Sequence, residues 1–164
     1  MAKAIALIVS ALCILAIADF AHAHGEYHVQ GQIYCDTCRV QFATRIADPI
    51  EGAAVRLECR KRDGSENVTY SVEGVTDVEG LYHLPVEGEH ENEICEVILV
   101  KSPREDCSEQ MDDFNRARVV CSSNSGIDNA GQVRYANALG FMIKEALPGC
   151  KQVLDELGFF PLHE

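Results

Sequence analysis

The stretch "YCDTC", residues 34–38, decides how this chain should be interpreted, because it places Cys35 and Cys38 two residues apart. That spacing has three interpretations: a redox-active dithiol, half of a zinc site, or the ends of two separate structural disulfides. The first would make the chain an enzyme, the second a metal module and the third a cross-linked scaffold. The sequence around the pair discriminates among them.

The context of the pair weakens both reactive interpretations. A thioredoxin-like active site needs its cysteines at the start of a helix, where the helix dipole lowers the thiol pKa. Here an alternating apolar segment precedes the pair, and the following "RVQFATRI" (39–46) is rich in β-branched and aromatic residues. Zinc sites most often combine two close pairs of ligands, and the sequence has no second C-x-x-C.

Chain entropy favours two structural disulfides. A bond within the C-x-x-C closes a loop of about four residues and destabilises the unfolded state by roughly 1.9 kcal/mol, whereas a loop of about 110 residues does so by roughly 4.8 kcal/mol. Distant partners for Cys35 and Cys38 would also tie one strand end to two remote segments. We therefore expect each cysteine to bond elsewhere.

The first 23 residues have the regions of a secretory signal peptide. Lys3 supplies the positive charge, residues 4–18 form an apolar run, and Ala21-His-Ala23 is a small-x-small cleavage site. The apolar run is short for a transmembrane helix and none like it recurs, so we expect no membrane insertion. The mature protein is then a single domain, residues 24–164.

The cysteine count fits a secreted protein with one thiol left over. Secretion places the chain in an oxidising compartment, where pairing is the default. Cys13 leaves with the signal peptide, and an odd number of cysteines remains. At least one is therefore free or bonded to another chain, and counting alone does not fix the pairing. The seven are Cys35, Cys38, Cys59, Cys95, Cys107, Cys121 and Cys150.

The charge balance excludes some classes of partner. The chain has 26 acidic and 14 basic residues and a net charge of −12. Nucleic acid and anionic lipid would repel such a protein, so we expect neither as a partner. The simplest explanation of the charge is a well-solvated, soluble surface. The alternative is that the acidic surface binds a basic patch on a partner.

Short alternating segments predict strands. In residues 53–60 the side chains of Val55, Leu57 and Cys59 share one face, which is the period of a half-buried strand. Residues 29–35, 67–75 and 81–86 alternate similarly, and 94–100 is so apolar that we expect a central strand covered on both faces. Turn pairs such as Asp63-Gly64 separate these segments. The pattern indicates an antiparallel sandwich or barrel.

Two segments have helical patterns. Ser102-Pro-Arg-Glu105 resembles a capping box with proline at the first helical position, which predicts a helix to about Asn115. Near the C-terminus, Val153, Leu154 and Leu157 form the stripe of a short amphipathic helix.

Signatures of catalysis are missing from the sequence. It contains no G-x-S-x-G, H-E-x-x-H or phosphate-binding loop, and it has no tryptophan to stack on sugars. His24 would follow the cleavage site and, with His28, has the groups to chelate copper, but a terminal histidine without a role is the commoner case. We expect no catalytic residue, no cofactor and no bound metal. Asn67-Val-Thr69 is a sequon, and we expect a glycan on Asn67.

Five blocks of the chain together resemble the Ole e I-like pollen protein family, most closely its anther-specific LAT-type members. The blocks occur in order and cover nearly all of the mature chain: "GQIYCDTCRV" (31–40), "GAAVRLECR" (52–60), "GVTDVEGLYHLPV" (74–86), "ICEVILVKSPREDC" (94–107) and "ALPGCKQVLDELGFFPL" (146–162). The resemblance implies an all-β fold, a disulfide-bridged, antiparallel, seven-stranded β-barrel or sandwich of transthyretin-like type. With the pattern above, we add a short C-terminal helix.

The resemblance also implies a disulfide pattern. Carried onto the matching positions, it pairs Cys35 with Cys107, Cys38 with Cys150, and Cys59 with Cys95. Cys121 has no counterpart in this six-cysteine pattern, so we expect a free thiol there, with an intermolecular bridge as the alternative. The sequon at Asn67 departs from the glycan position of the olive protein, so glycan-dependent behaviour does not transfer.

The function implied by the resemblance is that of a secreted, non-catalytic glycoprotein of the extracellular space, acting in pollen hydration, germination or pollen-tube growth. The implied partners are a receptor-kinase ectodomain at the cell surface and, if the protein is an allergen, IgE. We expect a monomer or weak dimer. The segments that we expect to contact the partner are residues 106–118 and 122–131. A secreted small-ligand carrier and an enzyme acting on cell-wall polysaccharide are the alternatives.

Overall fold

The first strand, β1 (Tyr27–Asp36), pairs with different neighbours along its two halves. Its first half lies antiparallel to β5 (Leu81–Val86) and parallel to β9 (Val133–Tyr135). The structure is a computed structural model that describes residues 27–112, 114–124 and 133–159. The predicted signal peptide and its cleavage site, together with His24, lie outside these residues.

The second half of β1 completes the larger sheet. It lies antiparallel to β2 (Asp48–Pro49) and parallel to β10 (Leu139–Ile143), and β7 (Cys107–Gln110) pairs with the far side of β10. Six strands thus form this sheet.

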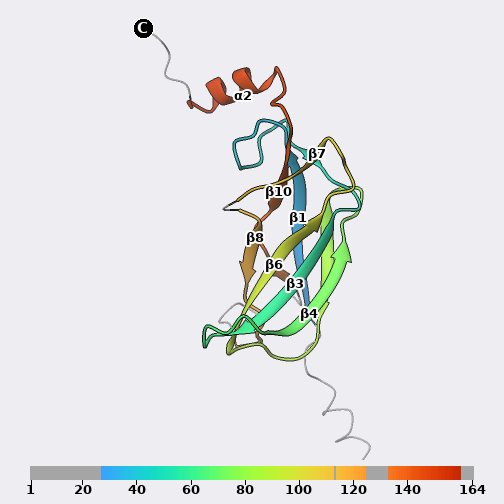
Figure 1. Ribbon diagram of the computed structural model, residues 1–164, viewed down its shortest axis with the longest axis vertical. Coiled ribbons are helices and arrows are strands. Elements are labelled where there is room, and N and C mark those ends of the chain that lie inside the picture. Colours follow the sequence, from blue (N-terminus) through green and yellow to red (C-terminus); the bar gives the residue numbers. More distant parts are fainter. Residues whose placement is uncertain (1–26, 113, 125–132, 160–164) are drawn as a thin grey trace, which may run out of the picture.

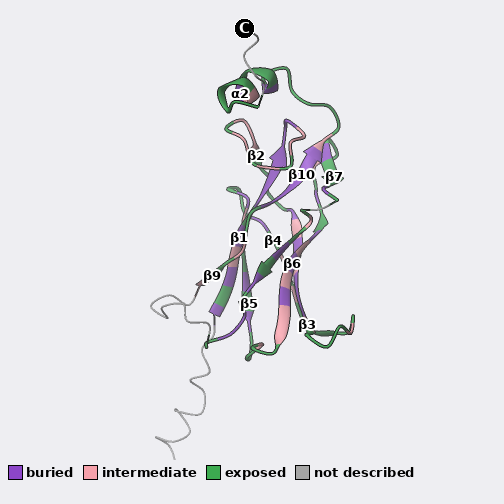
Figure 2. Ribbon diagram, turned by 90° about the vertical axis from the view of Figure 1, so that its left-hand side faces the viewer, coloured by how far each residue is buried: buried purple, intermediate pink, exposed green. Residues whose placement is uncertain are grey.

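The smaller sheet has the order β4-β3-β6-β8, and all of its neighbours are antiparallel. Its strands are β3 (Ala54–Lys61), β4 (Val68–Val75), β6 (Glu93–Lys101) and β8 (Arg116–Val119). Figure 2 shows the buried residues on strands of both sheets. A membrane-crossing helix is not found in the part of the chain that the structure describes.

The core lies between the two sheets, as the alternation predicts. Val55, Leu57 and Cys59 on β3 are fully buried, and so are Tyr82 and Leu84 on β5. On β6 the inward residues are buried and the outward ones partly covered, so the expectation of two covered faces holds only in part. The edge strand β4 is the least buried of the predicted strands, because only one neighbour flanks it.

The predicted sandwich is confirmed, with two differences in detail. The described residues form ten strands rather than seven, and the sheets do not close into a barrel. Four of the ten strands, β2, β7, β8 and β9, have two to four residues each, too few to show alternation. Both β9 and β10 run parallel to β1, a direction that long-range packing sets and that no local pattern reports.

The helix expected over residues 102–115 is wrong. This segment turns and then forms β7, and Cys107 at the start of β7 is bonded to Cys35. The Ser102 hydroxyl does accept the Arg104 backbone N–H at 3.2 Å, but it closes a local turn rather than a helix cap. The expected C-terminal helix is present as α2 (Cys150–Glu156), and the side chain of its Val153 is buried.

Candidate partner-binding surface

Three disulfides cross-link the sandwich. Cys35 is bonded to Cys107, Cys38 to Cys150, and Cys59 to Cys95, the same pairs that the family resemblance implies. The two cysteines of "YCDTC" therefore diverge: the first ties β1 to β7 and the second ties the following loop to α2. Cys121 is a buried free thiol.

The residues after Cys35 form a loop that the protein holds firmly, here called the tethered loop (residues 37–47). The Asp36 carboxylate is buried and accepts the backbone N–H groups of Cys38 at 3.0 Å and Gln41 at 2.6 Å. The Thr37 hydroxyl donates to the Ile46 carbonyl at 2.9 Å and so closes the loop at its base. The short side chain of aspartate is suited to this role, because its carboxylate can accept hydrogen bonds from backbone N–H groups of a turn that have no backbone partner.

Arg39 clamps the tethered loop to the larger sheet. Its guanidinium makes two bonds to the Glu109 carboxylate on β7, at 2.8 and 2.7 Å, and a third to the Ile143 carbonyl on β10 at 2.5 Å. The bond to Arg39 lowers the pKa of Glu109. A planar guanidinium fits this bidentate contact, which a lysine cannot reproduce.

The tethered loop has a strained backbone. Arg39 has φ of 56° and Gln41 has φ of 65°, and neither is a glycine. Such residues cost of order 1–3 kcal/mol each and persist where the surroundings over-determine them. The cysteine bonds, Asp36 and the Arg39 clamp supply that constraint.

Helix α2 and the residues that flank it also contact the tethered loop. Arg45 is paired with Glu156 at 3.0 Å, and the Leu147 backbone N–H donates to the Thr37 carbonyl at 3.0 Å. The rings of Phe42 and Phe159 stack with their centroids 5.4 Å apart. Each contact joins the loop to the segment that Cys150 already ties to it.

Two apolar hollows meet at the tethered loop. The first, of about 260 Å³, is here called the aromatic groove, and Phe114, whose side chain is 55% exposed, stands in its wall. The second, of about 310 Å³, lies between the loop and α2. Phe42 and Ala43 line both hollows, so they form one surface. The other apolar and aromatic residues of the groove are Tyr34, Ala138 and Leu139, with Arg116, Gln41 and Asn137 at its polar edge.

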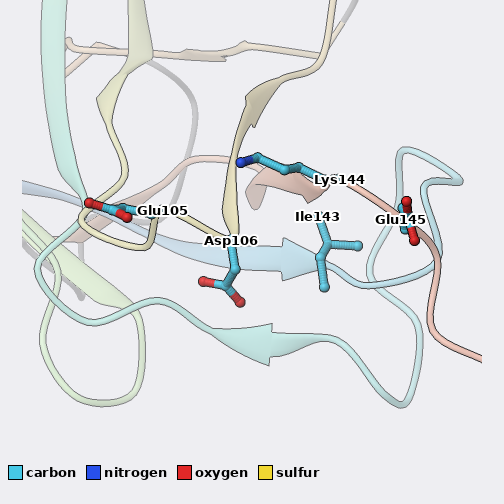
Figure 3. A pocket seen from close by; sticks show the side chains of 5 residues that line it. All are labelled: Glu105, Asp106, Ile143, Lys144 and Glu145. Carbon is cyan, nitrogen blue, oxygen red and sulfur yellow. The ribbon is translucent and has the colours of Figure 1, made fainter.

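A third hollow, of about 540 Å³, is acidic, and Figure 3 shows the side chains that line it. Glu105, Asp106 and Glu145 line it, with Ile143 and a single ammonium, that of Lys144. Arg104 holds Asp106 by two bonds, at 3.2 and 2.7 Å, which lower the pKa of Asp106. The hollow is therefore anionic and faces solvent. Ile143, which accepts from Arg39, joins it to the tethered loop.

The two segments that the sequence analysis expected to contact a partner differ in how much of them the structure describes. Within residues 106–118, Asp106 lines the acidic hollow and Phe114 and Arg116 line the aromatic groove. Most of residues 122–131 lie outside the described residues. Sequence reasoning missed the tethered loop, although two diverging cysteine bonds at one point of the chain are the signal that would have found it.

Asn67 is exposed and directly precedes β4. Figure 1 shows the turn between β3 and β4 at the opposite end of the molecule from α2. A glycan on Asn67 would thus leave the tethered loop uncovered.

The chain as a whole is similar to pollen proteins. A family model described as "Pollen protein Ole e 1 like" matches residues 25–158. "Anther-specific protein LAT52" of Solanum lycopersicum is 58% identical over 163 residues, with 99% of each chain covered. "Pollen allergen Che a 1" of Chenopodium album is 48% identical over 162 residues, covering 96% of this chain and 95% of that one. The crystal structure of the major plantain pollen allergen Pla l 1 matches with a TM-score of 0.65 and 37% identity, over 76% of this chain and 99% of that chain.

Proposed function

This chain belongs to the Ole e 1-like pollen protein family, and from that premise we propose that it is a secreted, non-catalytic pollen protein that binds a receptor ectodomain at the cell surface. Pollen hydration, germination or tube growth is the process it would serve. The named relatives are pollen allergens and pollen-specific proteins, which supports a role in pollen.

The tethered loop is the observation that carries this proposal. Binding costs less when the contacting segment is already ordered, and here disulfides, the Asp36 carboxylate and the Arg39 clamp order the loop in advance. The ordered loop presents Phe42 beside the exposed Phe114. Aromatic side chains in a groove are typical anchors of protein interfaces.

The negative charges of this chain indicate what kind of partner surface would fit it. The acidic hollow carries three carboxylates, and the whole chain has a net charge of −12. A receptor surface that fits would carry basic side chains next to an apolar anchor. Opposite charges would also speed the encounter of the two proteins, and the effect would weaken with salt.

Four further parts of the proposal concern cleavage, glycosylation, location and recognition by IgE. We propose cleavage after Ala23, so that residues 24–164 form the mature domain, and a glycan on Asn67. Three disulfides support an extracellular location, because such bonds persist in oxidising compartments. The relatives named as pollen allergens support IgE binding by this chain.

The test is affinity capture from pollen membranes with the oxidised, glycosylated chain 24–164. Phe114→Ala removes an anchor of the aromatic groove, and Val120→Ala is the matched control, because Val120 is similarly exposed, at 52% against 55%. A buried aromatic anchor is worth about 2 kcal/mol or more, so Phe114→Ala should weaken binding of the captured receptor by about 30-fold. Val120→Ala should leave binding unchanged. Equal capture by both variants would place the contact elsewhere, and capture of no membrane protein by the unaltered chain would refute the function.

A further inference from the structure

The Cys59–Cys95 disulfide joins two strands that are already neighbours. The two cysteines lie directly opposite each other on β3 and β6, with Cα atoms 4.0 Å apart, and the ladder continues on both sides of them. The flanking pairs are Glu58 with Glu96 and Arg60 with Ile94. Opening this bond would therefore leave both sulfur atoms side by side on paired strands.

Two further side chains that bind metals stand beside this disulfide. His90 Nδ1 lies 2.6 Å from Glu93 Oε2, and its Nε2 lies 3.1 Å from the Glu87 carbonyl oxygen. One donor atom from each of Cys59, His90, Glu93 and Cys95 lies within 4.8 Å of all the others. In the sequence, His90 is flanked by Glu89 and Glu91 and belongs to no metal-binding motif.

The backbone fixes the position of this histidine. The His90 N–H donates to the Cys121 carbonyl at 2.9 Å, and the Glu93 N–H donates to the His90 carbonyl at 3.0 Å. The imidazole also lies against the Tyr70 ring, with centroids 4.6 Å apart. His90 and Glu93 are thus held in place whether or not the disulfide is closed.

We propose that reduction of Cys59–Cys95 creates a zinc site, in which the two thiolates, His90 and Glu93 bind one Zn²⁺. In the oxidised protein the sulfurs are bonded to each other and offer no thiolate. A dithiol reductant supplies two electrons and two protons: the S–S bond breaks, two thiols form, and the reductant becomes a disulfide. Zn²⁺ then displaces both thiol protons, and His90 binds in its neutral form.

The donor set and its spacing suit zinc. Two sulfurs, one imidazole nitrogen and one carboxylate oxygen are ligands that tetrahedral zinc takes, and bond lengths of about 2.0–2.3 Å put neighbouring donors ~3.3–3.8 Å apart. In the oxidised protein the four donor atoms lie within 4.8 Å of one another. A hollow of about 100 Å³, lined by His90, Glu93 and Cys95, gives the ion a route from solvent.

Cys121 lines the same hollow but stands outside the proposed site. Its sulfur is not among the four donor atoms that lie within 4.8 Å of one another. Cys121→Ser should leave zinc binding intact.

The experiment uses the mature oxidised chain and a water-soluble phosphine, which opens disulfides without adding thiols that compete for zinc. Alkylation and peptide mapping identify which bonds open under native conditions. After reduction, one Zn²⁺ should bind and slow the alkylation of Cys59 and Cys95, and the oxidised chain should bind none there. His90→Ala and Glu93→Gln should each weaken binding by more than about 100-fold, beyond the loss expected for an outer-shell partner. His83→Ala, a change at an exposed histidine on β5, is the matched control and should have no effect.

Three results would overturn the proposal. The first is that Cys59–Cys95 does not open unless the protein unfolds. The second is that the opened protein binds no zinc. The third is that His90→Ala binds zinc as tightly as the unaltered chain, as loose thiols in an unfolded protein would.

Discussion

Replacing Cys38 and Cys150 together by alanine should destabilise the protein less than their separation of 112 residues suggests. In the unfolded oxidised chain the Cys35–Cys107 bridge stays closed. The shortest covalent path between Cys38 and Cys150 runs through that bridge and spans only about 46 residues. The expected loss in free energy of unfolding is then roughly 4.0 kcal/mol, compared with roughly 4.8 kcal/mol if the bridge had no influence.

The matched variant replaces Cys59 and Cys95 by alanine. Both pairs are buried, so the lost side-chain contacts are comparable. The separation of Cys59 and Cys95 is 36 residues, and the route through the Cys35–Cys107 bridge is no shorter. The expected loss is roughly 3.8 kcal/mol, so the two variants should differ by only about 0.2 kcal/mol.

The assay is urea unfolding of the oxidised mature protein without reductant, followed by far-ultraviolet circular dichroism. Both variants should also show larger m-values, because their unfolded chains are less compact. If the Cys38/Cys150 variant loses about 1 kcal/mol more than the other, which is about fivefold in the equilibrium constant, the bridges act independently and the nested-loop reasoning fails.

Changes at three single residues, Gly80, Cys121 and Asn67, give the remaining predictions. Gly80→Ala should destabilise the protein clearly more than Gly64→Ala in thermal unfolding: both have positive φ, which costs about 1–2 kcal/mol, but only at Gly80 would the new Cβ lie 2.5 Å from the Ile33 carbonyl oxygen. Burial raises the pKa of Cys121 to about 12 from 9.0, so its thiol should react with a disulfide reagent only after unfolding. Between pH 9.0 and about 12, only the unfolded state loses the thiol proton of Cys121. The free energy of unfolding should therefore fall as the pH rises through this range, and it should fall less steeply in Cys121→Ala. Peptide-N-glycosidase should lower the mass of the secreted protein, whereas Asn67→Gln should show no such change.

The alternating strands were predictable because burial on one face leaves a local record. Val55, Leu57 and Cys59 alternate with charged residues, and the structure buries all three. The pairing direction leaves no such record. Nothing within residues 133–143 shows that β9 and β10 run parallel to β1, since that depends on where the chain returns.

The candidate surface was predictable only in part. Phe114 falls within a segment that the sequence analysis expected to make contacts, whereas "RVQFATRI" showed only a composition rich in β-branched and aromatic residues. Its actual conformation depends on Asp36 and Arg39, whose partners are contacts that alternation does not encode. The pairing of the cysteines came from family resemblance, because counting left it open. No motif in the sequence connects His90 and Glu93 with Cys59 and Cys95, which the fold brings together.

The bond between Cys38 and Cys150 also governs what a protease can remove. The connection from Lys144 to Gly149 is exposed, so it offers a cleavage site just before α2. A cut after Lys144 would not release the C-terminal segment, because Cys150 keeps it attached to the tethered loop. The nicked protein would travel as one molecule until it is reduced. Its digestion would thus depend on the reducing power of the compartment as well as on the protease.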